Sequence, residues 1–401
     1  MVKYEALIHD RKYFEIEHIT ERQSQYNFTQ AVKVETFLWD LELYGQLQYH
    51  LGKNIVLKGG TAAQLFFPPQ QQRTSVDIDV VYLGDEGLLL NSFKSIHQAF
   101  GGDDLYFKFN KYTPVKPKTI LPMVTYFVSV PSVSSRKTPL NIKIDFHLME
   151  RFDLETTRIE TESAFIIPLA FKPLCFSAGS LLGDKLLTLA QGSVGIPIER
   201  EDDIVKQLYD IDLLSRIVDV KDTDVVRHAM NVLFERELKA RNEQVQFEVA
   251  LQQIMALLEK YSHLDSPRSE RMARDAVHNF RSNYEPRPFR NWINWGVITK
   301  RLQFLIKAFI EDPESALEIL KEADQIEKLL SLEGNEKRGV IRKELSSVFV
   351  EMLKSAGQIE IARRLRNSSP ERLFWEVLRP SNLKEVKNQI LTNVPPGQTT
   401  K

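Results

Sequence analysis

The chain has 401 residues, of which 43% are hydrophobic and 27% charged, and its formal net charge is −1 at pH 7. This composition is that of a folded soluble protein, and the length suggests two or three domains rather than one core. The single cysteine, Cys175, excludes an internal disulfide and fits a reducing compartment such as the cytoplasm. No N-terminal apolar signal segment and no run of ~18 apolar residues is found, so we expect neither secretion nor a membrane span.

The first predicted elements are a long helix and a set of short strands. Residues 34–51 repeat their apolar positions at helical spacing, with Phe37, Leu38, Leu41 and Tyr44 on one stripe. Short runs rich in β-branched and aromatic residues, bounded by Gly, Pro or Ser, predict five strands: 54–58, 76–83, 105–110, 123–130 and 140–148. The run 87–100 predicts a helix lying on the sheet that these strands form.

The pattern changes after the fifth strand and becomes almost wholly helical from Ser177 to Leu391. We therefore predict an α+β protein in which residues 1–175 form a mixed α/β domain with an N-terminal helix. Residues 176–391 would form a helical domain, and residues 392–401 would be a frayed tail.

The stretch LKGGTAAQLFFPPQQQRTSVDIDVV (57–81) opens with a turn suited to phosphate. Gly59, Gly60 and Thr61 connect a predicted strand to a short predicted helix. Glycine lets backbone amides approach a ligand closely, and a threonine at the N-cap of a helix leaves neighbouring N–H groups that favour phosphate oxygens. A Gly-Gly-Thr turn alone is more often structural, so its meaning depends on the strand that comes after it.

That strand contains Asp77-Ile78-Asp79, framed by aliphatic residues. Strand alternation places the two carboxylates on one face, ~7 Å apart, where they repel each other unless a cation lies between them. Such hard oxygen ligands suit Mg²⁺ or Mn²⁺. Asp145, on the polar face of the last predicted strand, could supply a third ligand or act as a general base, although an exposed strand face also accepts such a residue. A phosphate-binding turn followed by paired aspartates is the layout that metal-assisted nucleotide transfer needs.

These motifs resemble the DNA-polymerase-β-type nucleotidyltransferase fold, a mixed sheet with flanking helices. More narrowly, they resemble the AbiEii/MenT-type nucleotidyltransferase toxins of bacterial toxin–antitoxin and phage-defence systems. The resemblance covers roughly residues 50–215 and includes two later motifs. DKLLTLAQG supplies Lys185 and Thr188 on one helix face, and REDDIVKQLYDIDLL supplies Arg200, Asp203 and Asp210.

The resemblance implies a divalent-metal-dependent transferase and a role for each motif. The implied metal ligands for Mg²⁺ or Mn²⁺ are Asp77, Asp79 and Asp145. The implied NTP contacts are Gly59, Gly60, Thr61, Lys185 and Thr188, and Asp210 would orient Lys185 or the acceptor. Some members of the family add nucleotides to tRNA 3′ ends, so an RNA acceptor and a cognate antitoxin are the implied partners.

The sequence departs from the family pattern at two places. The loop between Thr61 and Asp77 is longer than usual, and PPQQQ (68–72) looks like the insertion. The last motif reads Lys-Gln-Leu-Tyr-Asp, whereas relatives often carry a second acidic residue before the Leu. The first departure leaves the carboxylates intact, and the second weakens the role implied for Asp210.

In the helical half, residues 267–301 mix cations with aromatic rings. Eight Lys or Arg stand against three Asp or Glu, interleaved with five rings: Phe280, Tyr284, Phe289, Trp292 and Trp295. Such mixing suits RNA, because cations contact phosphates while rings stack on bases. It equally suits an aromatic core covered by the aliphatic stems of arginines. A second basic run, 361–375, has the same two interpretations.

Two other functions remain open on the residues alone. The fold could serve as a catalytically silent binding protein, although a silent site has no physical reason to keep repelling carboxylates together. The enzyme could instead transfer a nucleotide to a protein or a small molecule. Nothing in the pattern identifies the NTP, because base recognition depends on the shape of the pocket.

Overall fold

The computed structural model describes residues 6–102, 106–113, 122–135, 138–264, 271–331 and 338–393. Seven strands form one mixed sheet in the order β3-β4-β5-β2-β1-β7-β6. The strands are β1 Ile55–Lys58, β2 Asp77–Tyr82, β3 Lys108–Lys111, β4 Met123–Val130, β5 Leu140–Leu148, β6 Thr156–Arg158 and β7 Leu174–Phe176. β2 runs parallel to β5 and β1 parallel to β7, whereas the remaining neighbours are antiparallel.

Four of the five predicted strands are confirmed as β1, β2, β4 and β5. The predicted strand 105–110 is displaced: β3 begins only after Phe107, whose φ of 49° breaks the extended backbone, and residue 105 lies outside the described residues. The three-residue strands β6 and β7 were missed, because so short a run carries no readable alternation. β7 is held in place by its neighbour, with Cys175 opposite Leu57 of β1.

Fifteen α-helices lie within the described residues, and the shortest has six residues. They are α1 Ile16–Gln25, α2 Ala31–Leu51, α3 Gly59–Gln64, α4 Glu86–Ala99, α5 Ala178–Thr188, α6 Glu201–Ile217, α7 Thr223–Arg241, α8 Phe247–Ser262, α9 Arg271–Asn283, α10 Trp292–Glu311, α11 Ala316–Leu329, α12 Arg338–Ser355, α13 Ile359–Leu365, α14 Pro370–Val377 and α15 Leu383–Asn393. None of these described helices is long and apolar enough to cross a membrane.

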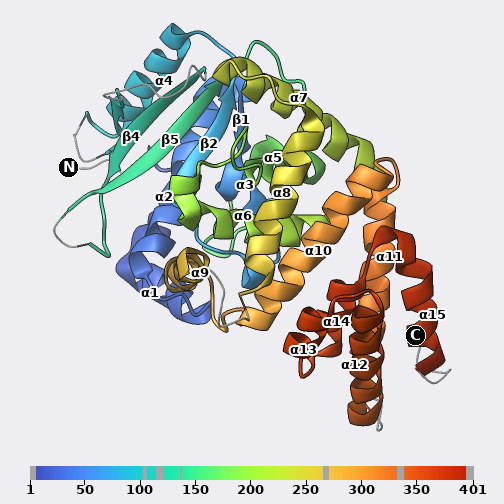
Figure 1. The fold of residues 1–401 in the computed structure, drawn as a ribbon. Coiled ribbons are helices and arrows are strands. Elements are labelled where there is room, and N and C mark those ends of the chain that lie inside the picture. The colour runs from blue at the N-terminus through green and yellow to red at the C-terminus, as the bar shows by residue number, and fades with distance from the viewer. Residues whose placement is uncertain are drawn as a thin grey trace.

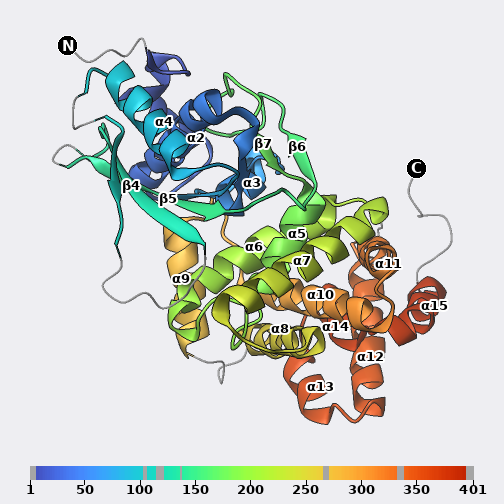
Figure 2. The same ribbon diagram turned by 90° about the horizontal axis from the view of Figure 1, so that it is seen from above.

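The sheet lies between two layers of helices. Figure 2 shows α2 and α4 on one side of it and α5 to α8 on the other. α2 contacts β1, β2 and β5, and α3 lies against β1 and β2 while also contacting α5 and α6. Helices α11 to α15 extend away from the sheet at the far end of α10 (Figure 1). The predicted α+β class is confirmed, and the predicted domain boundary at 175/176 falls inside strand β7.

Helix α2 was predicted with a single apolar stripe but is buried almost all round from Val34 to Leu47. Its carboxylates anchor neighbouring segments: Glu42 accepts hydrogen bonds from the backbone of Ile8 and His9, and Glu35 from the loop that follows β4. Asp40 differs, because it is fully buried and neither carboxylate oxygen has a hydrogen-bond partner in the described chain. Burial, reinforced by the charges of Asp77 and Asp79, raises the pKa of Asp40 well above its usual value.

Candidate active site

The predicted acidic residues come together on neighbouring strands at the centre of the sheet. In β2, Asp77 and Asp79 are half-buried and point away from the buried Ile78 and Val80, as strand alternation predicts. In the parallel pairing of β2 with β5, Asp79 stands directly opposite Asp145. Three carboxylates therefore share one face of the sheet.

The turn before α3 touches this acidic face. Gly59 has a φ of +71°, and a Cβ atom built on it would lie 2.2 Å from a carboxylate oxygen of Asp79. Two features therefore exclude a side chain at position 59: the backbone conformation and the neighbouring carboxylate. Lys58, the residue before it, is paired with Asp79 in the β1–β2 register, and its ammonium lies 3.1 Å from Asp184 of α5.

Electrostatics on this face favour a bound cation. Burial, together with the charges of Asp77 and Asp145, raises the pKa of Asp79 to about 7. Asp145 accepts hydrogen bonds from Thr125 and from Lys143, which lies two residues earlier on the same strand. No group of three or more Asp, Glu, His or Cys side chains in the described chain already converges as a metal site does. The fit to a metal ion thus rests on the repelling pair Asp77 and Asp79, with Asp145 turned toward Lys143.

A cationic cluster lies on the other side of the glycine turn. A Cβ atom on Gly60 would lie 2.9 Å from a guanidinium nitrogen of Arg73 and 3.0 Å from the hydroxyl of Ser75. Ser75 is 1% exposed, and its hydroxyl has no hydrogen-bond partner among the described residues. Arg73 is 3% exposed. Gly60 is therefore closely covered by one buried cation and one unused hydroxyl.

Arg73 and Lys185 both bind Asp210. The Arg73 guanidinium donates to the two carboxylate oxygens of Asp210 at 2.9 and 2.6 Å, and the ammonium of Lys185 lies 2.8 Å from the same carboxylate. Gln64 of α3 donates a further hydrogen bond to it at 2.9 Å. Burial alone would raise the pKa of Asp210, but Arg73 and Lys185 hold that pKa below its usual value. With two cations and one anion, the buried cluster carries a net charge of +1.

The structure places Thr61 and Thr188 differently from the sequence-based expectation. The prediction that Thr61 is a helix N-cap is wrong, because α3 already begins at Gly59 with Lys58 as its N-cap. The Thr61 hydroxyl is fully buried and donates to the backbone carbonyl of Asp77 at 2.9 Å. The Thr188 hydroxyl donates to the carbonyl of Lys185 in its own helix. Both hydroxyls hold the backbone near the site.

The remaining residues of the last motif form a surface network. Asp203 is paired with Arg200 and with Lys206. The Lys206 ammonium also lies 4.4 Å from the centre of the Tyr284 ring. The backbone carbonyl of Tyr284 accepts a hydrogen bond from the amide of Thr74, next to Arg73. The end of α9 therefore supports the loop that carries Arg73.

Within the described part of the basic segment, most cations and rings are used internally. Phe280 and Trp295 are buried in the core. The Arg281 guanidinium stacks on Trp292 and donates to the carbonyl of Arg290, and Arg290 pairs with the buried Glu285. Only Arg287 of the three central arginines has an exposed side chain. Residues 267–270 lie outside the described residues.

The second basic run divides in the same way: Arg363, Arg364 and Arg366 are exposed, whereas Arg372 is buried and paired with Glu376. In the predicted tail, residues 392 and 393 still belong to α15, and residues 394–401 lie outside the described residues.

Three residues near the site were missed by sequence reasoning, and two of them, Arg73 and Ser75, come from one loop. Both stand in RTSVDID, directly before the paired aspartates, in the loop that is longer than the family pattern. An arginine and two hydroxyl residues at the entry to an acidic strand were the available signal. Lys58, which precedes the glycines and reaches toward α5, is a third residue of this kind.

The acidic face, the glycine turn and the Arg73–Asp210–Lys185 cluster all lie within a segment that resembles known proteins. The sequence profile of the family described as "Nucleotidyl transferase AbiEii toxin, Type IV TA system" matches residues 43–295, more than half of the chain. The chain belongs to this family. It is therefore a nucleotidyltransferase of a toxin–antitoxin system, and membership implies an NTP substrate and a cognate antitoxin.

Solved structures include distant likenesses of this AbiEii protein. MenT4, a nucleotidyltransferase toxin of Mycobacterium tuberculosis H37Rv, is 14% identical over 72% of this chain and 94% of its own, with a TM-score of 0.42. JHP933 of Helicobacter pylori is 15% identical over 70% of this chain and 97% of its own, with a TM-score of 0.33. No curated protein matches the chain. The assignment rests on the family profile, whose match ends before α11.

Proposed function

We propose that this AbiEii protein transfers a nucleotide from an NTP to an RNA, in a reaction that requires Mg²⁺ or Mn²⁺. One observation carries the proposal: an unbroken series of contacts joins the acidic face to the cationic cluster. Asp79 contacts Gly59, and Arg73 contacts the next residue, Gly60. Arg73 and Lys185 in turn both form ion pairs with Asp210. Ligands for a cation and for a triphosphate therefore meet at one glycine turn.

The triphosphate would lie over Gly59 and Gly60. Without Cβ atoms there, phosphate oxygens can approach the backbone amides at the start of α3. Arg73 and Lys185 would supply positive charge, and the unused hydroxyl of Ser75 would supply a hydrogen bond. Asp210 would act as a positioning residue, because it fixes both cations while neutralising only one of their two charges.

Asp77 and Asp79 would hold the metal ions, with Asp145 as a further ligand once it turns from Lys143. When bound, Mg²⁺ or Mn²⁺ neutralises charge on the reacting phosphate oxygens. The raised pKa of Asp79 supports this role, since a carboxylate crowded by two others is stabilised by a cation.

The transfer itself replaces a phosphoanhydride bond of the NTP with a phosphodiester bond to the acceptor. A hydroxyl oxygen of the acceptor would bond to the α-phosphorus, and the bond from that phosphorus to the β-phosphate oxygen would break. Pyrophosphate leaves, and the hydroxyl proton passes to a carboxylate of the acidic face or to water. Lys185 and Arg73 would stabilise the charge that develops on the leaving pyrophosphate.

The acceptor that we propose is the 3′-terminal hydroxyl of an RNA, with tRNA as the first candidate, and the reaction would take place in the cytoplasm. The proposal is tested with total RNA, Mg²⁺ or Mn²⁺, and each NTP labelled at either the α- or the γ-phosphate. Label should enter RNA only from the α-position, and periodate oxidation of the RNA 3′ ends should abolish it. Label in protein or in a small molecule instead would identify a different acceptor and overturn the RNA assignment.

A further inference from the structure

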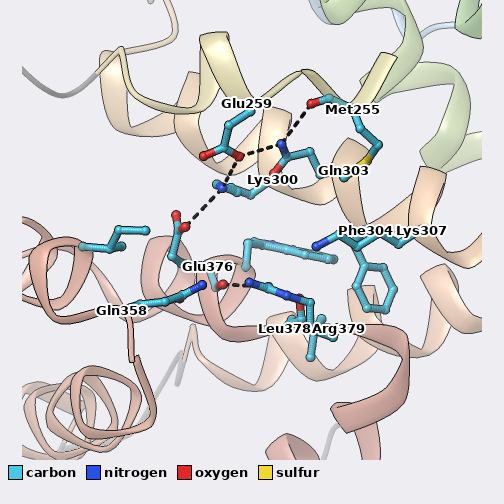
Figure 3. A pocket seen from close by; sticks show the side chains of 12 residues that line it. Met255, Glu259, Lys300, Gln303, Phe304, Lys307, Gln358, Glu376, Leu378 and Arg379 are labelled. Carbon is cyan, nitrogen blue, oxygen red and sulfur yellow. Dashed lines mark hydrogen bonds and ion pairs between the residues drawn. The ribbon is translucent and has the colours of Figure 1, made fainter. Parts of the chain in front are cut away.

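A polar cavity lies in the helical half of the chain, lined by α8 from the segment that the family profile matches and by residues that follow that segment. It has a volume of about 120 Å³ and lies between α8, α10 and the segment from α13 to the end of α14. Figure 3 shows Lys300 and Lys307 reaching into it from α10, with Arg379 opposite. Phe304 and Trp375 supply its apolar wall.

The carboxylates at this cavity are already neutralised. Lys300 binds Glu259 at 2.8 Å and Glu376 at 3.1 Å, as the dashed lines in Figure 3 mark. Glu376 also pairs with the buried Arg372, and the other oxygen of Glu259 binds His263. Neither carboxylate has an oxygen left without a partner to attract a further cation.

Two other cations at the same cavity form no direct ion pair with a described residue. Lys307 forms no direct ion pair or hydrogen bond with a described residue, although the charges of Glu259 and of Glu311, one helical turn further on, act on it. Arg379 donates from a single guanidinium nitrogen, to the backbone carbonyls of Glu376 and Leu378. Counting Lys300, Lys307, Arg372 and Arg379 against Glu259, Glu376 and Glu311, whose charge also acts on Lys307, leaves a charge of +1.

The cations at this cavity repel one another, as the lowered pKa of Lys307 indicates. Burial lowers the pKa of Lys307 to about 8, the charges of Arg379 and Lys300 add to the decrease, and the charges of Glu259 and Glu311 only partly oppose it. A half-buried ammonium that is repelled by its neighbours gains free energy when an anion enters beside it.

We propose that this cavity binds a phosphate group. A phosphate carries up to two negative charges and several acceptor oxygens, which suits two cations that have free N–H donors and no direct ion pair. The group could belong to a free nucleotide or inorganic phosphate, or to the backbone of a nucleic acid. The inference does not depend on nucleotidyl transfer, because none of these residues touches the candidate active site.

The test compares three proteins: the wild type, the double variant Lys307→Gln with Arg379→Gln, and the control Arg363→Gln with Arg366→Gln. The control removes the same charge from exposed positions in α13 and at its C-cap, neither of which lines the cavity. Calorimetric titrations use inorganic phosphate, AMP and a short oligoribonucleotide without a terminal phosphate. We expect the cavity variant to bind at least about tenfold more weakly and the control to bind like wild type.

Preference for inorganic phosphate or AMP would assign the site to small phosphates, and preference for the oligoribonucleotide would assign it to a backbone. Both results support the site. The single variant Lys307→Gln provides a second measure, because it leaves the Arg379 hydrogen bonds in place. Three results would overturn the proposal: no probe binds the wild type, the cavity variants bind as well as wild type, or the control loses as much affinity.

Discussion

Arg73 binds Asp210 through both carboxylate oxygens, at 2.9 and 2.6 Å, although the two residues lie 137 positions apart in the chain. Both side chains are almost completely buried. The contact ties the loop before the acidic strand to α6 and places the guanidinium beside Gly60. It therefore links the architecture of the AbiEii protein directly to its candidate phosphate site.

Arg73→Gln should destabilise the fold by ~3–5 kcal/mol, because it removes one partner of a buried ion pair and leaves Lys185 as the only cation that binds Asp210. Arg73→Lys keeps the charge but loses the paired hydrogen bonds, so its loss of stability should be smaller. Urea unfolding measures both effects. Equal stability of wild type and Arg73→Gln would contradict the assigned contact.

Gly59→Ala should lower both stability and transfer activity. The new Cβ needs an unfavourable backbone conformation and also collides with Asp79, and such overpacking costs ~1–3 kcal/mol. Gly52→Ala is the matched control, since Gly52 has a φ of +60° with no atom within 4 Å of the added Cβ. We expect both variants to lose stability and only Gly59→Ala to lose activity. If both variants lost the same amount of activity, Gly59 would have no specific role in the candidate active site.

Comparison with Asp40→Asn should show that the buried carboxyl group of Asp40 makes the wild type less stable as pH rises. The folded pKa of Asp40 is raised well above the value of ~3.9 expected in the unfolded chain. Above pH ~4 the unfolded chain therefore loses a proton that the folded protein keeps, and stability falls by up to ~1.4 kcal/mol per pH unit. Urea unfolding between about pH 4 and pH 7 should show that the free energy of unfolding of the variant increases relative to that of the wild type as pH rises. Parallel pH curves would show that Asp40 is not a buried, protonated carboxyl group.

Arg290→Gln and Arg287→Gln should have different effects although they lie in one basic segment. Arg290→Gln leaves the buried Glu285 unpaired and should cost ~3 kcal/mol or more of stability. The exposed Arg287 should affect stability little, but a phosphate contact through it would change the slope of log K against log salt by ~0.7 to ~0.9. Urea unfolding and RNA binding at several salt concentrations measure the two effects. If Arg287→Gln left the salt dependence of RNA binding unchanged, the role of this segment would be purely structural.

The strands around the acidic face were predictable because their alternation is local. Asp77 and Asp79 share a face for the reason that any two strand residues at i and i+2 do, and β5 places Asp145 by the same rule. The register that sets Asp79 opposite Asp145 is a tertiary property, so only the structure could supply it.

The cationic half of the site was predictable only in part. The sequence motifs indicated Lys185 and Asp210, but Arg73 enters the cluster through a loop whose conformation depends on Gln64, Tyr284 and Asp210. The error at Thr61 has a local cause: Gly59 adopts a positive φ at the turn, and the N-cap of the helix is Lys58, three residues earlier. Which aromatic residues of the basic segment are core could not be read from spacing alone, because helical periodicity is the same for a core and a binding surface.

The most direct test of metal-dependent nucleotide transfer compares wild type with Asp79→Asn, using an α-labelled NTP, total RNA, and Mg²⁺ or Mn²⁺. The substitution keeps the shape of the side chain but removes one of the crowded charges. We predict that incorporation into RNA falls at least about a hundredfold, because metal assistance is worth several kcal/mol of barrier, while thermal stability stays equal or rises. A folded Asp79→Asn protein that labels RNA as fast as the wild type would contradict the account.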